Sequence, residues 1–450
     1  MRRAVLLASV GLVAMAVLLP AGTEARPDSP APQNTAAAAA AVKRGDIFFL
    51  KEDYKAAIAA YDDAIRFDPK YAEAYESRGK AYDMQGDYGR AIADFNKAIE
   101  LGLRKALAYA ERGQVYNHSG DYGRAIADFK EAIALNPGNK TFYTARGRAY
   151  LDKGDYSQAL ADLNVAVDMD PVYAQSYRVR GEIYDKKGDL DRAIADYDKA
   201  IVLDPAEAVA FLCRGDAYQE KGDFDRAIAD YTKGLEIHPH DAGTYLDRAR
   251  AYIDKQDYDR AIADYGQSIR IAPKSKRAYY ARAAAYDDIG SWTDALSDLR
   301  AAATIAPNDD DVRLRLWLVR AKLGKSDEAD AQLGRYVNQR TPEAMDAGAR
   351  KIADYLLGRI SEAEMLSFPL TTSDGAQTKA MNRQKCAACF YAGSVHQIHG
   401  DRAGAKALFE LSVATDQRES FEFLSAGAAL RKLQKTGSLS DSIGRPSAPF

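Results

Sequence analysis

Small residues recur every thirty-four positions along most of this chain and set the register of its apolar and polar residues. A strict period of this length predicts a solenoid, because one supersecondary unit cannot bury its apolar face alone and must stack on neighbours. Counted from Ala38, the small residue is the eighth of each unit, and the series is Gly45, Gly79, Gly113, Gly147, Gly181, Gly215, Ala249 and Ala283.

The pattern inside each unit predicts two antiparallel helices. In the fourth unit, aromatic residues stand at the fourth and eleventh positions, Tyr143 and Tyr150. These positions share one helical face with the small residue at position eight. Gly154 ends the first helix and Asp155 caps the second, whereas Pro171 blocks any continuation of the second helix. The predicted fold is therefore all-α.

The register also divides the chain into segments. It weakens after the eighth unit, where Trp317 takes the place of the small residue, and it recovers from Cys386, with Gly393 in the eighth position. The predicted segments are a signal peptide at 1–25, a flexible linker at 26–37, eight regular units at 38–309, a degenerate unit at 310–343, a divergent helix and loop at 344–385, a repeat-like unit at 386–419, a capping helix at 420–435 and a disordered tail at 436–450.

The first residues predict export. Arg2 and Arg3 precede an apolar stretch from Ala4 to Leu19, and cleavage is expected after Ala25. An uncleaved anchor is the alternative, although the apolar stretch is short for a membrane span. The expected location is periplasmic or secreted, and no stable membrane span is expected after cleavage.

The spacing of small, aromatic and proline positions resembles the tetratricopeptide repeat (TPR). The resemblance covers residues Ala38 to Asp309 as eight well-matched units. It implies a superhelical solenoid of antiparallel helix pairs with a C-terminal capping helix, and a role in binding other proteins.

The C-terminal run CFYAGSVHQIHGDRAGAKALFELSVATDQRESFEFLSAGAAL carries a second resemblance. Its FY-x-G, G-D, A-x-x-LF and F-E features resemble the last unit of the periplasmic adaptor lipoprotein NlpI and related proteins. That resemblance implies an adaptor in envelope maintenance, with cell-wall hydrolases or a periplasmic protease as partners. This chain lacks the lipid-bearing cysteine, since Thr23 stands where it would be needed.

Charge and composition argue against several functions. The chain has 62 basic and 65 acidic residues, a net charge of −3, so no global field favours nucleic acid. From Asp310 to Phe450 we find no strand alternation, glycine-rich phosphate loop or Ser/His/Asp set. We therefore expect no enzyme activity and no cofactor.

Cys386, Cys389, His396 and His399 suggest zinc, but their spacing argues against a metal site. If they lie on one helix, the first and last are roughly 20 Å apart, since each residue rises about 1.5 Å. Packing in the repeat core is the favoured interpretation. A disulfide between Cys386 and Cys389 is the second, and a metal site is the third.

Arginine recurs at position seven and aspartate at position twenty-three. We predict that folding each hairpin pairs them, as for Arg180 with Asp196, and that a ligand-binding role for these arginines is the alternative. A second arginine series, which includes Arg192, precedes the same aspartates by four residues and should add only a few tenths of a kcal/mol.

Partner binding is expected on the concave surface, at positions two, five, nine and twelve of the first helices. The candidate residues are Glu73, Glu76, Arg148, Arg178, Glu182, Asp185, Asp216, Arg250, Tyr280 and Asp287. A solvated surface would show the same mixed charges. The predicted function is an exported scaffold or adaptor. The alternatives are a non-catalytic, substrate-recruiting subunit of an envelope enzyme and a self-associating structural array.

Overall fold

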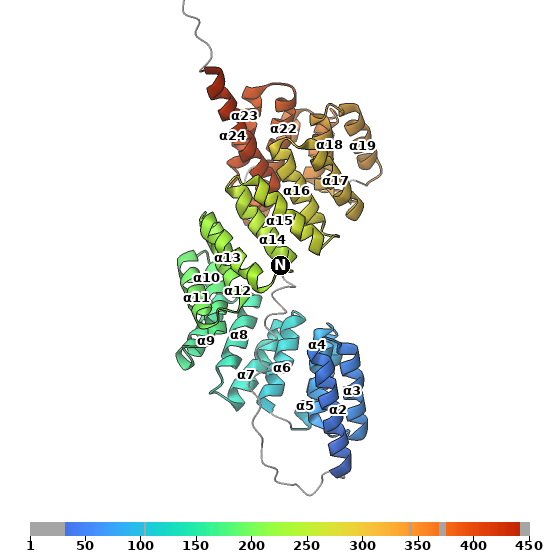
Figure 1. Cartoon of the computed structure of the whole chain (residues 1–450), viewed down its shortest axis with the longest axis vertical. Helices are drawn as coiled ribbons and strands as arrows, with labels where there is room; N and C mark the ends of the chain where they lie inside the picture. Colours follow the sequence, from blue (N-terminus) through green and yellow to red (C-terminus); the bar gives the residue numbers. More distant parts are fainter. Residues whose placement is uncertain (1–31, 103–104, 342–343, 369–374, 442–450) are drawn as a thin grey trace, which may run out of the picture. The chain divides into compact units, whose positions relative to one another are not determined.

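A computed structural model describes residues 32–102, 105–341, 344–368 and 375–441 (Figure 1). Every regular element in these ranges is a helix, which confirms the predicted all-α fold. The chain divides into two units, the first ending at Lys221 and the second beginning at Gly222. The predicted signal peptide lies outside the described residues.

Consecutive helices of unit 1 pack as hairpins, as the period predicts. They are α2 (Pro32–Leu50), α3 (Tyr54–Phe67), α4 (Ala72–Met84), α5 (Tyr88–Glu100), α6 (Lys105–His118), α7 (Tyr122–Leu135), α8 (Lys140–Lys153), α9 (Tyr156–Met169), α10 (Ala174–Lys186), α11 (Leu190–Leu203) and α12 (Ala208–Glu220).

Unit 2 continues the repeat and ends in helices of other lengths. They are α13 (Phe224–Ile237), α14 (Ala242–Asp254), α15 (Tyr258–Ile271), α16 (Lys276–Ile289), α17 (Trp292–Ile305), α18 (Asp310–Lys322), α19 (Ser326–Asn338), α20 (Ala347–Leu356), α21 (Glu362–Met365), α22 (Gly375–Ile398), α23 (Arg402–Val413) and α24 (Phe421–Asp441).

The turn inside each hairpin has the predicted chemistry. Gly154 adopts a left-handed conformation with φ of 88°, and its N–H donates to the carbonyls of Tyr150 and Leu151. Asp155 then accepts a hydrogen bond from the N–H of Gln158 and caps α9. At the equivalent place in the seventh repeat, Gln256 is held at φ of 63°. A side chain in that conformation costs free energy that glycine would not.

The small residue at position eight allows an aromatic ring of the second helix to lie against the first. A Cβ added to Gly181 would come within 2.7 Å of the Tyr197 ring and 3.2 Å of the Ala193 carbonyl. Tyr197 is only 1% exposed, and Ala193 is fully buried. Helix packing in the hairpin therefore depends on the small residue, as the sequence indicated.

The predicted arginine–aspartate ladder is present. Arg180 donates from Nε and Nη2 to the two carboxylate oxygens of Asp196, each at 2.8 Å. The same bidentate pair recurs in both units, as Arg78–Asp94, Arg112–Asp128, Arg146–Asp162, Arg248–Asp264 and Arg282–Asp298. In the first repeat Ala60 occupies position twenty-three, and Arg44 pairs with Asp63 instead.

The ladder also joins successive repeats, which the sequence pattern had not suggested. Arg180 uses its remaining nitrogen, Nη1, to donate to Asn164 Oδ1 of the preceding repeat at 2.9 Å. Arg248 likewise reaches Thr232 Oγ1 at 3.0 Å. Each such guanidinium therefore bonds within its own hairpin and to the hairpin before it.

The second arginine series has a different partner from the one expected. Arg260 donates from Nε to Asp257, the capping residue three positions earlier, at 2.6 Å. Its guanidinium also lies 4.8 Å from the centre of the Tyr252 ring. The expected partner, Asp264, is already bound by Arg248, so the prediction of an Arg–Asp pair four residues apart was wrong.

Two predicted boundaries need correction. Helix α2 begins at Pro32, inside the predicted flexible linker, because an alanine run favours helix and proline suits a first helical position. Helix α24 continues to Asp441, past the predicted start of the disordered tail at 436, since extending a formed helix adds a hydrogen bond per residue. The loop predicted around Pro369 lies outside the described residues.

Candidate protein-binding surface

Positions two, five, nine and twelve of the first helices define one face in each unit. We call the face on α2, α4, α6, α8, α10 and α12 the unit-1 face, and the face on α14, α16 and α18 the unit-2 face. Of the ten predicted binding residues, seven lie on the unit-1 face. Arg250, Tyr280 and Asp287 lie on the unit-2 face.

The unit-2 face is occupied by the C-terminal helix of the chain. Helix α24 packs against α16 as well as α22 and α23 (Figure 1). The Phe421 ring meets the Tyr280 ring edge-on, with 5.1 Å between centroids, and the Tyr280 hydroxyl donates to Glu422 at 3.1 Å. Arg250 donates to the Glu419 carbonyl at 3.4 Å. Two of the predicted partner-binding residues thus bind a segment of their own chain.

The third residue, Asp287, belongs to a buried charge cluster. Its carboxylate accepts from Lys322 Nζ at 2.6 Å and lies 3.5 Å from Nε of Arg315, a residue with no exposed surface. Arg315 also donates to Ser425 Oγ of α24 at 2.6 Å. Burial opposes ionisation of Asp287, but Lys322 and Arg315 outweigh it and hold its pKa below the ordinary value. Asp287 is therefore a structural residue.

The unit-1 face has a different environment. Among the described residues, the helices that pack closely on α4, α6, α8, α10 and α12 are their neighbours in the chain. Glu76 accepts from Lys80 Nζ at 2.8 Å, and the same ammonium lies 3.3 Å from Glu111. Glu73 accepts from the Tyr71 hydroxyl at 2.7 Å. These groups are linked laterally along the face.

Further along the unit-1 face, two arginines share one carboxylate. Arg148 Nη1 lies 2.8 Å from Glu182, and Arg178 donates to Glu182 as well. Arg178 also donates from Nε to Glu207 at 2.6 Å, and its side chain is only 4% exposed. Arg178 is thus held inside the repeat array, whereas Arg148 and Glu182 are partly accessible.

Asp185 and Asp216 come next on adjacent helices. Asp216 is exposed and Asp185 is half-buried. Burial raises the pKa of Asp185 to about 6, Lys186 acts in the opposite direction, and Glu220, Asp216 and Glu182 raise it further. The three neighbouring carboxylates therefore oppose the ionisation of Asp185.

The cysteine and histidine set lies on one helix, as predicted, with His399 just past its end. Cys386 and Cys389 of α22 are free, buried thiols, so the disulfide stays a prediction. Burial raises the pKa of Cys389 to about 11. His396 lies between Asp401 at 2.6 Å and Glu362 at 2.8 Å. Within the described residues, no group of His, Cys, Asp or Glu has the arrangement that a metal ion needs.

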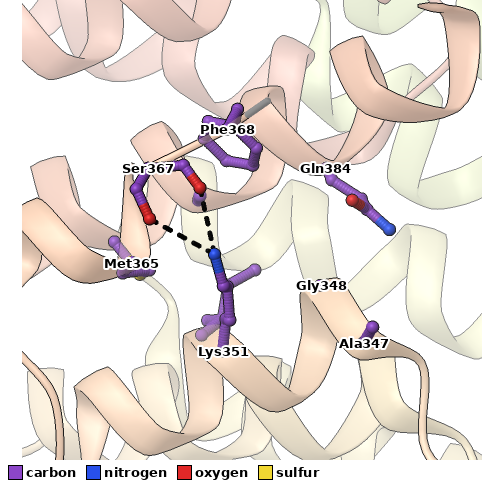
Figure 2. Close-up of a pocket in the computed structure, with 9 residues that line it drawn as sticks. Ala347, Gly348, Lys351, Met365, Ser367, Phe368 and Gln384 are labelled. Atoms are coloured by element: carbon purple, nitrogen blue, oxygen red, sulfur yellow. Dashed lines mark hydrogen bonds between the residues drawn. The ribbon is translucent and has the colours of Figure 1, made fainter. Parts of the chain in front are cut away.

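A small pocket lies where α20 and α22 meet the segment that follows α21. Figure 2 shows Lys351 donating to the Ser367 carbonyl at 3.0 Å, beside Met365 and Phe368. Its volume is about 110 Å³. Pockets for small-molecule ligands usually measure about 300–1,000 Å³, so this one has room for no more than a single apolar side chain.

Comparisons with known families agree with the repeat geometry. A model described as "TPR repeat" matches residues 45–86, and two described as "Tetratricopeptide repeat" match residues 77–140, 144–208 and 218–285. The chain belongs to the tetratricopeptide repeat family. A comparison with curated proteins gives no match.

Solved structures of TPR proteins are similar over parts of the chain. MamA is 26% identical with a TM-score of 0.33, and the match covers 36% of this chain and 95% of MamA. A TPR protein of Parabacteroides merdae is 18% identical with a TM-score of 0.45, and the match covers 55% of this chain and 98% of that protein. A TPR protein of Thermus thermophilus is 24% identical with a TM-score of 0.38, and the match covers 40% of this chain and 99% of that protein.

Sequence reasoning missed the residues through which this TPR chain binds its own last helix. Arg315 is the clearest example, because a charged residue inside the apolar run Leu314 to Leu318 signals a buried ion pair. A second signal was available in α14, where Leu246 and Ile253 make positions five and twelve apolar. Phe421 and Leu424 of α24 pack against the cluster that contains these two residues.

Proposed function

We propose that this TPR chain is an exported, non-catalytic scaffold or adaptor that binds other proteins through the unit-1 face. Tetratricopeptide repeats are protein-interaction modules, and the family models match along both units. One observation carries the choice of face. Helix α24 occupies the unit-2 face, whereas the described helices packed on the unit-1 face are its neighbours in the chain.

The location and partners follow from the sequence. The expected signal peptide supports export to the periplasm or beyond it. No helix among the described residues has the length and apolar character of a membrane span. The resemblance of the C-terminal unit to NlpI supports a role in envelope maintenance, with cell-wall hydrolases or a periplasmic protease as partners.

Capture of partners from an envelope extract, with the full chain as bait, tests this proposal. The informative variant is Gln114→Trp, which places a bulky ring at position nine of α6 on the unit-1 face. The matched control is Lys130→Trp, on the exposed surface of α7. We expect the first variant to lose most of the captured hydrolase or protease and the control to retain it.

The outcomes separate the alternatives. If both variants capture the same proteins as the original chain, the unit-1 face is not the binding surface. Capture of an envelope enzyme together with its substrate would favour the substrate-recruiting subunit. If the main captured protein is a second copy of this chain, and sedimentation of the purified chain shows oligomers, the self-associating array replaces the adaptor.

A further inference from the structure

His396 of α22 has a carboxylate within hydrogen-bonding distance of each of its ring nitrogens. Nδ1 lies 2.6 Å from Asp401, at the start of α23, and Nε2 lies 2.8 Å from Glu362 of α21. An ionised carboxylate only accepts hydrogen bonds, and a neutral imidazole has a single N–H. Two hydrogen bonds at these distances therefore require a proton on both ring nitrogens, which is the charged imidazolium form.

The packing of α22 on α23 leaves room for the imidazole ring at this place. A Cβ added to Gly404, in the first turn of α23, would come within 2.5 Å of His396 Nδ1 and would also meet the Asp401 carboxylate. With its other oxygen, Asp401 accepts the N–H of Gly404 at 3.0 Å and caps α23. The glycine therefore allows the ring to lie beside a carboxylate that is itself held in position.

Glu362 belongs to a short segment of unit 2 that we call the strap, residues 361–368, which contains α21. Met365 anchors the strap in the apolar core and is only 1% exposed. Together with Ser367 and Phe368, Met365 also lines the small pocket against α20 and α22 (Figure 2). A change in how the strap is held therefore changes one wall of that pocket.

Polar contacts with α20 also hold the strap. The Tyr355 hydroxyl donates to Glu362 at 3.3 Å, and Lys351 donates to the Ser367 carbonyl at 3.0 Å. The contact between Glu362 and His396, at 2.8 Å, is shorter than either and joins the strap to α22. It also depends on the protonation of the ring, because the second N–H exists only in the imidazolium form.

We infer that His396 is a pH-dependent clasp that holds the strap on α22 and α23. As an imidazolium, it bonds to Asp401 and to Glu362 at the same time. When the ring loses one proton, the remaining N–H stays with Asp401, which is the closer carboxylate and is fixed as a helix cap. The ring then presents a lone pair to Glu362, so the strap loosens and the pocket wall that it forms opens.

The pKa of His396 sets the direction of this change. The hydrogen bond with Asp401 is the main cause that raises this pKa, burial acts against it, and Glu362 raises it further. Because Glu362 is a neighbour only while the strap is closed, the pKa is higher in the closed form than in the loosened form. Closure is therefore fully stabilised below the pKa of the loosened form, and it weakens as the pH rises through the pKa of the closed form.

Other titratable groups face the clasp from α20, α22 and α23. Burial, followed by the charge of Glu362, raises the pKa of Tyr355 to about 12. Burial raises the pKa of Cys389 to about 11, and Lys385 acts in the opposite direction. Hydrogen bonds from Gly404 and His396 hold the pKa of Asp401 below its ordinary value. Tyr355, Cys389 and Asp401 therefore keep their charge between about pH 6 and about pH 9, whereas a histidine titrates there.

Hydrogen exchange of the full chain between about pH 6 and about pH 9 tests the inference, because His396 loses its proton in this range. The probes are the amides of Met365 and Leu366, which donate to carbonyls inside the strap. Their protection, corrected for the intrinsic exchange rate at each pH, should fall about fivefold as the pH rises, as expected for the loss of one partly exposed, charge-assisted hydrogen bond. Helix α17 of the same unit is the internal reference and should not follow this profile.

Three variants separate the clasp from the fold. His396→Gln cannot carry a charge, so the strap should have the low protection at every pH. Gly404→Ala changes no charge and favours helix in α23, but its methyl group displaces the ring and should also abolish the pH dependence. The matched control Glu410→Gln removes an exposed acid of α23 and should keep the full pH dependence.

Nitrogen NMR of the ring measures the proton directly, because the imidazolium carries a proton on both nitrogens and the neutral ring on one. His396 should be the imidazolium at pH 6. Its titration midpoint should fall in Asp401→Asn, and by less in Glu362→Gln, since Asp401 is the main cause of the raised pKa. Asparagine also caps helices well, so Asp401→Asn leaves α23 capped.

Two results would overturn the inference. One is a neutral His396 ring at pH 6. The other is the same pH dependence of strap protection in the original chain, in His396→Gln and in Gly404→Ala. Neither result bears on the proposed function, which is tested separately by capture with Gln114→Trp on the unit-1 face.

Discussion

The unit-1 face and the unit-2 face come from the same repeat, yet they have opposite environments. On the unit-2 face, Tyr280 and the buried Arg315 bond to α24, and α24 also packs on the apolar cluster that contains Leu246. On the unit-1 face, charged residues such as Arg148 and Glu182 pair with each other, and burial raises the pKa of Asp185. The hairpin scaffold is common to both units. The residues that do not follow the repeat pattern decide which face is covered by a segment of the same chain.

The largest expected effect comes from the cluster beneath α24. Arg315→Ala leaves Asp287 with one of its two buried cations removed, and breaking a buried ion pair in this way costs about 3–5 kcal/mol. The urea midpoint of unfolding should fall markedly, and hydrogen exchange in α24 should accelerate. The control Arg300→Ala changes an exposed arginine of α17 and should leave the urea midpoint and the hydrogen exchange of α24 nearly unchanged. An unchanged midpoint for Arg315→Ala would mean that α24 does not depend on this cluster.

A second experiment asks whether the scaffold is equivalent in the two units. Arg180→Ala and Asp196→Ala should couple in a double-mutant cycle by about 1–2 kcal/mol, because the pair is bidentate and mostly buried. Arg248→Ala and Asp264→Ala in unit 2 should couple to a similar extent. If the two substitutions have additive effects on the unfolding free energy in either unit, the Arg–Asp pair there orients the helices without stabilising the fold.

The smallest expected effect concerns one turn. Gln256→Gly should raise the unfolding free energy by about 1 kcal/mol, because it relieves a left-handed side-chain residue at φ of 63°. The reverse change in unit 1, Gly188→Gln, should lower it by a similar amount, since Gly188 has φ of 74°. Thermal midpoints measure both. A midpoint for Gln256→Gly that is no higher than that of the original chain would show that the side chain of Gln256 makes compensating contacts.

The sequence allowed most of the local structure to be predicted. The period gave the helix pairs, and it placed the glycine turns, the aspartate caps and pairs such as Arg180–Asp196. These features depend on residues at most one repeat apart, so a regular pattern records them. The second arginine series was assigned to the wrong aspartate because the capping residue, as at Asp257, competes for the guanidinium.

The occupied face could not be predicted in the same way. Contacts such as Tyr280–Phe421 and Arg315–Ser425 join residues far apart in the chain and occur once. A period carries no information about a contact that does not repeat. Of the predicted binding residues, those on the unit-1 face stay candidates, whereas Asp287 is structural and Arg178 is buried in ion pairs.

The third hydrogen bond of the ladder arginines has a mechanical consequence. Arg180 and Arg248 each bond to a residue of the preceding hairpin. A force that pulls one hairpin away therefore also acts on a guanidinium that is bonded to the adjacent hairpin. In an array with nearest-neighbour coupling of this kind, tension is shared between adjacent repeats. Under tension, such a chain would unfold in blocks of several repeats. Its resistance to extension would depend on one arginine in each repeat.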